Sequence, residues 1–200
     1  MRKELTALGA GALCGALCLA ACGRAPEERV AAPQPAANVP PASGSAAPAN
    51  VEWPYYAGNL SSQRYSPLDQ INRDNVGKLE IAWRFQTGNY GPKPESRNEA
   101  TPLVIGGVLY TTVGVTRNVV AIDPKTGETL WAYRPNDGED RYKAAPRKTS
   151  GRGLSYWTDH AGNERLFVVT PGFYLVALDP STGRQAPGFG ENGVVDLMGR

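Results

Sequence analysis

Two charged side chains, Glu99 and Arg152, stand where they could bind an anionic ligand. Each lies just before a segment with the pattern of a β-strand, the first strand of its own unit. A guanidinium stays charged and offers paired N–H donors to carboxylate oxygens. Arg152 therefore suits a ligand rich in carboxylates. The alternative is an exposed Glu–Arg pair, which would stabilise the fold by less than about 1 kcal/mol.

The rest of the sequence offers few groups for catalysis or metal binding. All three cysteines, Cys14, Cys18 and Cys22, lie near the start of the chain, so no disulfide framework or cysteine zinc site is expected after them. The only histidine, His160, falls in a segment typical of a hairpin loop, and a histidine cluster is excluded. We assign no catalytic residue and no metal ligand within the chain.

Composition favours a turn-rich, all-β protein. The 200 residues include 23 glycines and 17 prolines, which disfavours long helices. Charged residues make up 20% of the chain and the formal net charge is +2, so nucleic-acid binding driven by bulk charge is also disfavoured.

Four short segments after residue 100 have the pattern of antiparallel strands. The first two, 101–105 and 108–113, flank Gly106-Gly107, whose glycines adopt the positive φ of a two-residue hairpin without steric cost. The next two, 119–122 and 129–134, flank a longer turn. Together they predict a four-stranded antiparallel sheet.

The segment before this sheet carries weaker signals. Aromatic residues first appear at Trp53, where the folded region is expected to begin. A helical turn is predicted over 72–78, with Asn72 capping its first amides. Apolar and polar residues then alternate over 79–85, which predicts one half-buried strand.

The strand pattern repeats. Leu109-Tyr110 followed by 119–127 matches Leu166-Phe167 followed by 175–183, and Ala177 stands 56 residues after Ala121. A four-stranded repeat of this length is typical of a β-propeller blade, which buries its faces only against neighbouring blades.

The chain therefore holds about two blades plus one closing strand of a partial β-propeller, whereas closure needs at least about four blades. First strands line the central channel of a propeller. Glu99 and Arg152 are accordingly expected at the same rim of that channel.

The turn between the third and fourth strands has an Asp-Pro-x-Thr-Gly sequence in both units. Asp123 is expected to accept backbone amides within the bend, and Gly127 to supply a left-handed residue. Trp131 is placed to pack on the next blade and donate its indole N–H. In the second unit Pro187 stands where a tryptophan is expected, which leaves the docking of that blade open.

The N-terminal segment is predicted to be a targeting signal. Residues 1–22 have a positively charged start, an apolar stretch and the sequence Leu-Ala-Ala-Cys-Gly around Cys22, which resembles the lipobox of bacterial lipoproteins. Lipidation of Cys22 would anchor the protein, with sorting to the outer membrane; an ordinary cleaved signal is the alternative. Residues 23–52, rich in Ala and Pro, predict an extended linker, and 53–200 the folded domain.

Longer motifs resemble a known family. Three segments are similar to segments of the pyrroloquinoline quinone (PQQ) dehydrogenases. They are Trp53-Pro54-x-Tyr56, the run from Arg64 to Trp83, and Ala121-x-Asp123-x-x-Thr126-Gly127-x-x-x-Trp131. The PQQ dehydrogenases are eight-bladed propellers of the periplasm, and the resemblance is greatest to the membrane-associated glucose/quinate type. The segments 98–102 and 152–157 resemble those that bring a glutamate and an arginine to the cofactor. The resemblance implies that Arg152 binds PQQ and that Glu99 faces and orients it.

The resemblance implies oxidation of a sugar, polyol or related alcohol, with hydride transfer to PQQ and Ca²⁺ as a second cofactor. Electrons would pass to a membrane quinone or a cytochrome c and so to the respiratory chain. The catalytic base and the Ca²⁺ ligands would lie beyond Arg200, so the chain alone is expected to be inactive. Pro146 and Arg147 occupy the positions of two cysteines that form a disulfide in the alcohol-oxidising branch, which disfavours small alcohols.

A different class of protein shares some of these features. A non-catalytic β-propeller lipoprotein scaffold of the outer-membrane assembly type would equally explain Cys22, the linker and the docking turn. It would not explain the opening segment, Glu99 or Arg152.

Overall fold

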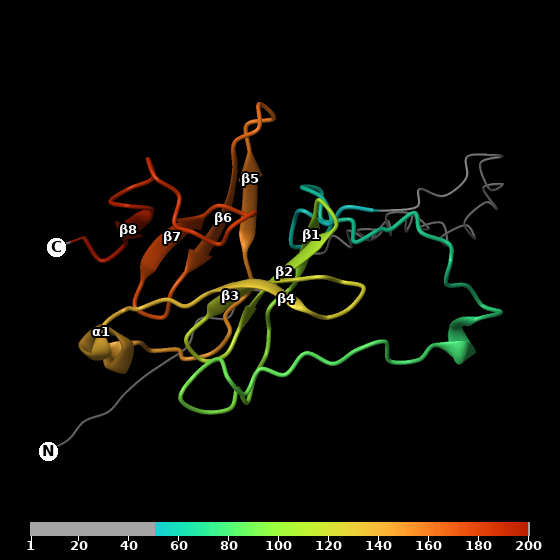
Figure 1. Ribbon diagram of the computed structural model, residues 1–200, viewed down its shortest axis with the longest axis horizontal. Helices are drawn as coiled ribbons and strands as arrows, with labels where there is room; N and C mark the ends of the chain where they lie inside the picture. Colours follow the sequence, from blue (N-terminus) through green and yellow to red (C-terminus); the bar gives the residue numbers. More distant parts are fainter. Residues whose placement is uncertain (1–50, 200) are drawn as a thin grey trace, which may run out of the picture. The chain divides into compact units, whose positions relative to one another are not determined.

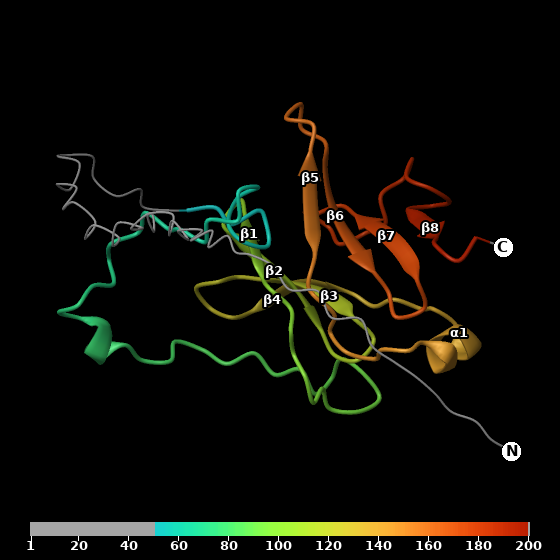
Figure 2. The same ribbon diagram turned by 180° about the vertical axis from the view of Figure 1, so that it is seen from behind.

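The computed structural model describes residues 51–199. The predictions for Cys22, the signal segment 1–22 and residues 23–50 of the linker lie outside them. The described chain forms two four-stranded antiparallel sheets, each with its strands in sequence order. Figures 1 and 2 show these as two groups of strands, one green to yellow and the other orange to red.

The elements follow one another with only two short helices among them. The first sheet contains β1 (Leu103–Ile105), β2 (Val108–Val113), β3 (Asn118–Ile122) and β4 (Thr129–Tyr133). The second sheet contains β5 (Ser155–Thr158), β6 (Glu164–Val169), β7 (Tyr174–Leu178) and β8 (Val194–Asp196). The helices are the 3-10 helix η1 (Val76–Lys78) and the α-helix α1 (Glu139–Ala144).

The repeat detected in the sequence corresponds to equivalent strands of the two sheets. β3 and β7 are the third strands, and their alanines Ala121 and Ala177 are fully buried at matching places. Gly106 and Gly107 have φ values of 59° and 75° and join β1 to β2 as the predicted hairpin. The prediction of an all-β protein built from four-stranded antiparallel units is confirmed.

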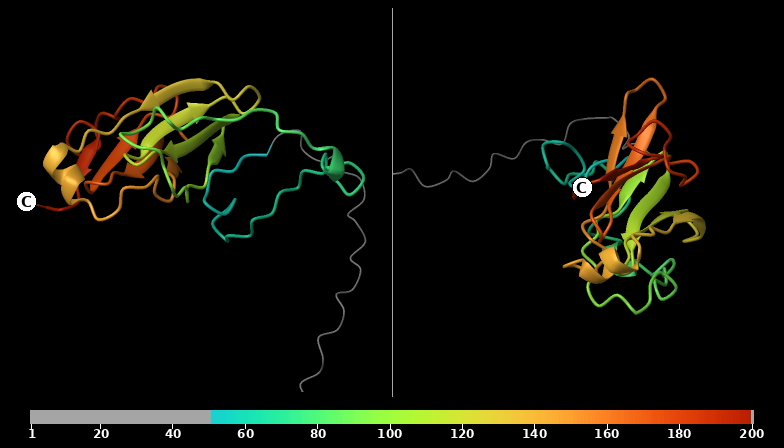
Figure 3. Two further views of the ribbon diagram at one scale, coloured as in Figure 1. Left: turned by 90° about the horizontal axis from the view of Figure 1, so that it is seen from below. Right: turned by 90° about the vertical axis from the view of Figure 1, so that its left-hand side faces the viewer.

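One hydrophobic core lies between the two sheets. It combines Leu103 and Val119 of the first sheet with Leu166 and Val176 of the second. Figure 3 shows the two sheets as separate layers from two further directions. Each sheet buries a face against the other, as neighbouring propeller blades do.

The second face of the first sheet is covered by an earlier part of the chain. Tyr90 is buried with Val120 and Ile122, and Trp83 and Phe85 pack against this cluster. The first sheet is therefore covered on both faces within the described residues.

Two tryptophans dock on the Asp-Pro turns. The Trp131 indole nitrogen donates to the carbonyl oxygen of Pro180 at 2.9 Å, and its ring lies so close to Gly183 that a Cβ there would come within 2.4 Å of it. Trp83 donates in the same way to Pro124 at 2.9 Å, with its ring against Gly127. The first turn thus receives Trp83, while Trp131 reaches the turn of the following sheet.

The turn that receives Trp83 is shaped by its own side chain. Asp123 Oδ1 accepts the backbone N–H groups of Lys125 at 2.7 Å and Thr126 at 3.4 Å. Gly127 has a φ of 76°, in the left-handed region where a side chain is strained. The carbonyl of Pro124 is thereby fixed in position for the indole.

Two local predictions need correction. Residues 79–85 form no strand, and Leu79 and Ile81 are 59% and 65% exposed, because no neighbouring strand among the described residues pairs with this segment. The expected helical turn over 72–78 is reduced to η1, although Asn72 Oδ1 does accept the N–H of Asp74 at 3.0 Å. The charged run that begins at Glu139 forms the helix α1.

Candidate anion-binding site

The two sheets are joined at the segments that lead into their first strands. Thr101, before β1, and Gly153, before β5, form an isolated parallel bridge, and the Thr101 N–H donates to the carbonyl of Arg152 at 3.4 Å. This bridge brings together the two side chains singled out in the sequence. The Nε of Arg152 lies 3.9 Å from Oε2 of Glu99.

Gly153 allows this close approach because it lacks a side chain. Its φ is +104°, and a Cβ at this position would lie 2.7 Å from the carbonyl oxygen of Thr101. A larger residue would therefore be strained in its backbone and would also press on the neighbouring segment.

Glu99 is shared between two arginines. Its Oε1 lies 2.8 Å from Arg97, whereas the contact with Arg152 is longer. The side chain of Glu99 is 32% exposed and that of Arg152 is 74% exposed. An exposed pair at this distance constrains Arg152 little, so its guanidinium keeps most of its donors free for a ligand.

Glu99 and Arg152 line the same hollow, which has a volume of about 300 Å³. Two further arginines, Arg117 and Arg147, reach it, so the lining carries three guanidinium groups and one carboxylate. Phe167, Val169 and Leu175 supply apolar surface. The hollow therefore combines an excess of positive charge with an apolar wall.

Arg117 holds the wall of this hollow together. Its Nε donates to the carbonyl of Thr149 at 3.3 Å, and its Nη1 donates to the carbonyls of Val169 at 2.9 Å and Thr170 at 3.4 Å. Burial, reinforced by the nearby charge of Arg147, lowers the pKa of Arg117 from its ordinary value, while Asp137 raises it. Arg117 remains charged at neutral pH and ties the β2–β3 turn to the second sheet.

Glu95 makes a parallel connection. Its Oε1 accepts the N–H of Ser150 at 2.8 Å and its Oε2 accepts the N–H of Gly114 at 3.2 Å. The loop that ends at Arg152 is thus held at two points: Arg117 binds the carbonyl of Thr149, and Glu95 binds the N–H of Ser150. The sequence analysis missed Arg117 and Glu95, because their partners are backbone groups that no side-chain pattern reveals.

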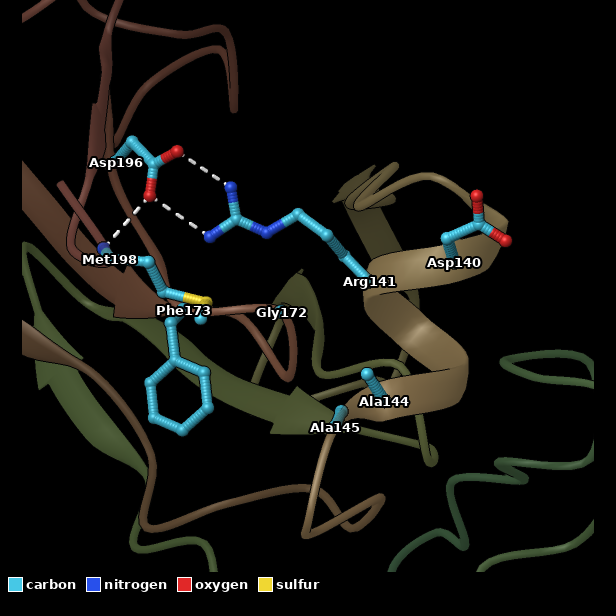
Figure 4. Close-up of a pocket in the computed structure, with 8 residues that line it drawn as sticks. All are labelled: Asp140, Arg141, Ala144, Ala145, Gly172, Phe173, Asp196 and Met198. Atoms are coloured by element: carbon cyan, nitrogen blue, oxygen red, sulfur yellow. Dashed lines mark hydrogen bonds and ion pairs between the residues drawn. The ribbon is translucent and has the colours of Figure 1, made fainter. Parts of the chain in front are cut away.

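A second hollow, of about 350 Å³, lies between α1 and the end of the second sheet. Figure 4 shows Arg141 of α1 pointing at Asp196, with its two terminal nitrogens 2.6 and 2.9 Å from the carboxylate oxygens. The Arg141 guanidinium also lies 3.9 Å from the ring centre of Tyr174. Because both charges are satisfied by each other, this contact fastens α1 to β8 and leaves no free cation for a ligand there.

Neither a metal centre nor a membrane span is found in the described part of the chain. Among residues 51–199, no three His, Cys, Asp or Glu side chains are grouped as metal ligands. The same residues contain no helix with the length and apolar character needed to cross a bilayer. His160 lies in the exposed loop between β5 and β6, as expected.

Two stacked four-stranded sheets, docked through Trp131 and meeting at a cationic hollow, define part of a β-propeller. The family model described as "PQQ: Glucose/ethanol/alcohol dehydrogenase, beta-propeller domain" matches residues 53–200. The chain belongs to this family. The predicted membership and the partial β-propeller are thereby confirmed, while the number of eight blades stays a prediction.

Individual relatives agree with this assignment. The chain is 34% identical over 164 residues to the glycerol dehydrogenase large subunit of Gluconobacter oxydans (strain 621H), covering 77% of this chain and 21% of the relative. It is 33% identical over 181 residues to the quinoprotein glucose dehydrogenase of the same organism, covering 82% and 22%.

A solved structure is similar as well. The crystal structure of quinohemoprotein alcohol dehydrogenase from Comamonas testosteroni matches with a TM-score of 0.54 and 32% identity, covering 66% of this chain and 18% of that one. The chain thus spans about a fifth of the length of the proteins it matches.

The residues of the cationic hollow fit PQQ, which is a planar aromatic tricarboxylate. Arg152 and Arg147 expose guanidinium donors that suit carboxylate oxygens, and Phe167 provides apolar surface suited to a flat ring. No equivalent set of ligands for Ca²⁺ is found among the described residues, so we derive no step through that ion.

Proposed function

We propose that this chain contributes two blades to a PQQ-dependent dehydrogenase that oxidises a sugar, polyol or related alcohol. One observation carries the proposal: Glu99 and Arg152 meet where β1 and β5 begin, beside a hollow with three guanidinium groups and one carboxylate. A buried or exposed structural ion pair would need no such excess of positive charge. Membership of the family supplies the chemical class of the ligand.

Each residue has a distinct role in this proposal. Arg152 would bind a carboxylate of PQQ, and Glu99 would face and orient the cofactor. Phe167 limits access of water to the ring. When bound, PQQ would supply the two-electron acceptor for the hydride that leaves the alcohol carbon, and a general base would take the hydroxyl proton. No catalytic base is assigned and no cluster of Ca²⁺ ligands is found among residues 51–199, so the chain alone is expected to be inactive.

The substrate class is narrowed by the residues near Arg152. Pro146 and Arg147 leave no thiols for a ring-facing disulfide, which favours the glucose/quinate branch over oxidation of small alcohols. Relatives named for glycerol and for glucose are both consistent with a polyhydroxylated substrate.

The cellular setting is proposed from the N-terminal segment. Lipidation of Cys22 anchors the protein on the periplasmic side, in the outer membrane, and electrons leave to a membrane quinone or a cytochrome c. Substitution Cys22→Ser is expected to release the protein from the membrane fraction. Unchanged fractionation of this variant would contradict the lipid anchor.

The decisive experiment is titration of the full-length gene product with PQQ in the presence of Ca²⁺, followed by dye-linked oxidation of a panel of sugars and polyols. Arg152→Ala is expected to weaken PQQ binding at least about tenfold, because a charge-assisted pair with a carboxylate is lost. Arg73→Ala, a substitution of an exposed arginine outside the hollow, is the matched control. Absence of PQQ binding, or binding indifferent to Arg152→Ala, would favour the non-catalytic lipoprotein scaffold instead.

A further inference from the structure

The cationic hollow contains more positive charge than its own carboxylate balances. Glu99 already pairs with Arg97 at 2.8 Å and lies 3.9 Å from Arg152. The N–H groups of Arg117 donate to backbone carbonyls. Arg147 makes no ion pair with any residue between 51 and 199.

Arg147 lies close to another cation. The side chains of Arg147 and Arg117 line a further hollow of about 280 Å³ as well as the cationic hollow. Burial is the main cause that lowers the pKa of Arg117, the charge of Asp137 opposes it, and the charge of Arg147 adds to it. Two like charges in such proximity repel each other. An anion bound between them would relieve this repulsion, whereas water alone does so only by screening.

The backbone on both sides of Arg147 is held in place. Pro146 restricts the φ angle immediately before it. The ammonium of Lys148 donates to the carbonyls of Lys143 at 2.9 Å and Ala145 at 3.0 Å, and the carbonyl of Thr149 accepts from Arg117. The side chain of Arg147 is exposed, and the loop that carries it is fixed. A fixed backbone reduces the entropy that is lost when such a side chain binds a ligand.

We propose that Arg147 is a second carboxylate-binding residue of the cationic hollow, acting on a carboxylate that Arg152 does not bind. This rests on the proposed function only for the identity of the ligand. The carboxylate belongs either to PQQ or to a polyhydroxy-acid substrate. In both cases the planar guanidinium forms paired N–H···O bonds with it.

The test uses the full-length protein and the variants Arg147→Gln and Arg147→Lys. PQQ is titrated without substrate, and benzene-1,3,5-tricarboxylate serves as a second planar tricarboxylate probe. Binding is followed by calorimetry and by the ligand-induced rise in melting temperature. Arg147→Gln is expected to weaken binding at least about tenfold, and Arg147→Lys to recover part of the loss, since a lysine keeps the charge but not the paired donors. Arg73→Gln is the matched control.

A second arm compares KM for a polyhydroxy acid with KM for a neutral polyol. If the Arg147→Gln protein binds PQQ more weakly than the unaltered protein, the carboxylate belongs to the cofactor. If its affinity for PQQ is unchanged and KM rises for the polyhydroxy acid but not for the neutral polyol, the carboxylate belongs to the substrate. If neither quantity changes, the role of Arg147 is overturned while the proposed function stands. If the unaltered protein binds no PQQ, the proposed function fails, and the tricarboxylate probe then decides for or against Arg147.

Discussion

Thr101 and Gly153 form a parallel bridge between the segments that lead into β1 and β5, and this bridge places Glu99 beside Arg152. Each partner lies within two residues of one of these charged side chains. The separation of the two functional candidates is therefore determined by backbone contact and not by their own long, weak ion pair at 3.9 Å. Changes to the bridge should affect ligand binding without altering either charge.

Gly153→Ala tests this relationship. Positive φ at an alanine costs about 1–2 kcal/mol, and here the added Cβ also comes within 2.7 Å of the Thr101 carbonyl oxygen, so we expect a loss of at least about 2 kcal/mol in the free energy of unfolding. Ligand affinity should fall as well. Denaturant unfolding and PQQ titration measure the two effects.

Gly162→Ala is a matched control for this prediction. Its φ is +99°, close to that of Gly153, but a Cβ there meets nothing within 4 Å. It should show the backbone strain alone and leave ligand affinity unchanged. Equal effects of the two substitutions would mean that the bridge does not position Arg152.

The sequence predicted the repeated elements far better than the contacts that align them. The Asp-Pro-x-Thr-Gly turns and the apolar third strands are local patterns, and β3 and β7 lie where the repeat placed them. Leu79 and Ile81 show the opposite case, since their alternation has the period of a strand but no partner strand among the described residues satisfies it.

The residues of the candidate site likewise include some that the sequence could predict and some that it could not. Glu99 and Arg152 could be placed together because both precede first strands of equivalent units. Arg117 could not, because it binds carbonyls of residues 32 to 53 positions further along the chain, and every residue type has a carbonyl. Such contacts carry no sequence signature.

Arg117→Gln is expected to destabilise the folded protein, because Arg117 joins the β2–β3 turn to the second sheet. The substitution leaves the carbonyls of Thr149, Val169 and Thr170 short of donors, which we expect to cost about 2–3 kcal/mol. Denaturant unfolding of the full-length protein measures the loss. Arg117→Lys should restore part of it.

The matched control for Arg117 is Arg165→Gln, because within residues 51–199 the Arg165 side chain donates only to the carbonyl of its neighbour Glu164. Affinity for PQQ should fall for Arg117→Gln and remain unchanged for the control. A destabilised Arg117→Gln protein with unaltered affinity would restrict Arg117 to a structural role.

Trp131→Phe tests the docking of the two sheets. The substitution removes the N–H that donates to Pro180 at 2.9 Å and part of the ring that covers Gly183. We expect the free energy of unfolding to fall by about 1–3 kcal/mol. Trp157→Phe, at an indole that is 47% exposed, should have little effect, and equal losses from both would contradict the docking role.

The ion pair between Arg141 and Asp196 predicts a pH dependence of stability. Hydrogen bonding from Arg141, with help from the Met198 N–H, lowers the pKa of Asp196 to about 2. A carboxyl whose pKa is lower in the folded protein stabilises the fold above its unfolded pKa of about 4, and this contribution disappears as the pH falls towards 2. The stability difference between the unaltered protein and Asp196→Asn should therefore be constant above about pH 5 and shrink between pH 4 and 2.

The measurement is denaturant unfolding at a series of pH values. Asp140→Asn is the control, because the Asp140 carboxylate on α1 makes no ion pair among the described residues. Its stability difference from the unaltered protein should lack the decline expected for Asp196→Asn. A difference for Asp196→Asn that stayed constant down to pH 2 would show that the carboxylate is not held by Arg141, and α1 would then have to be fastened to the second sheet by other contacts.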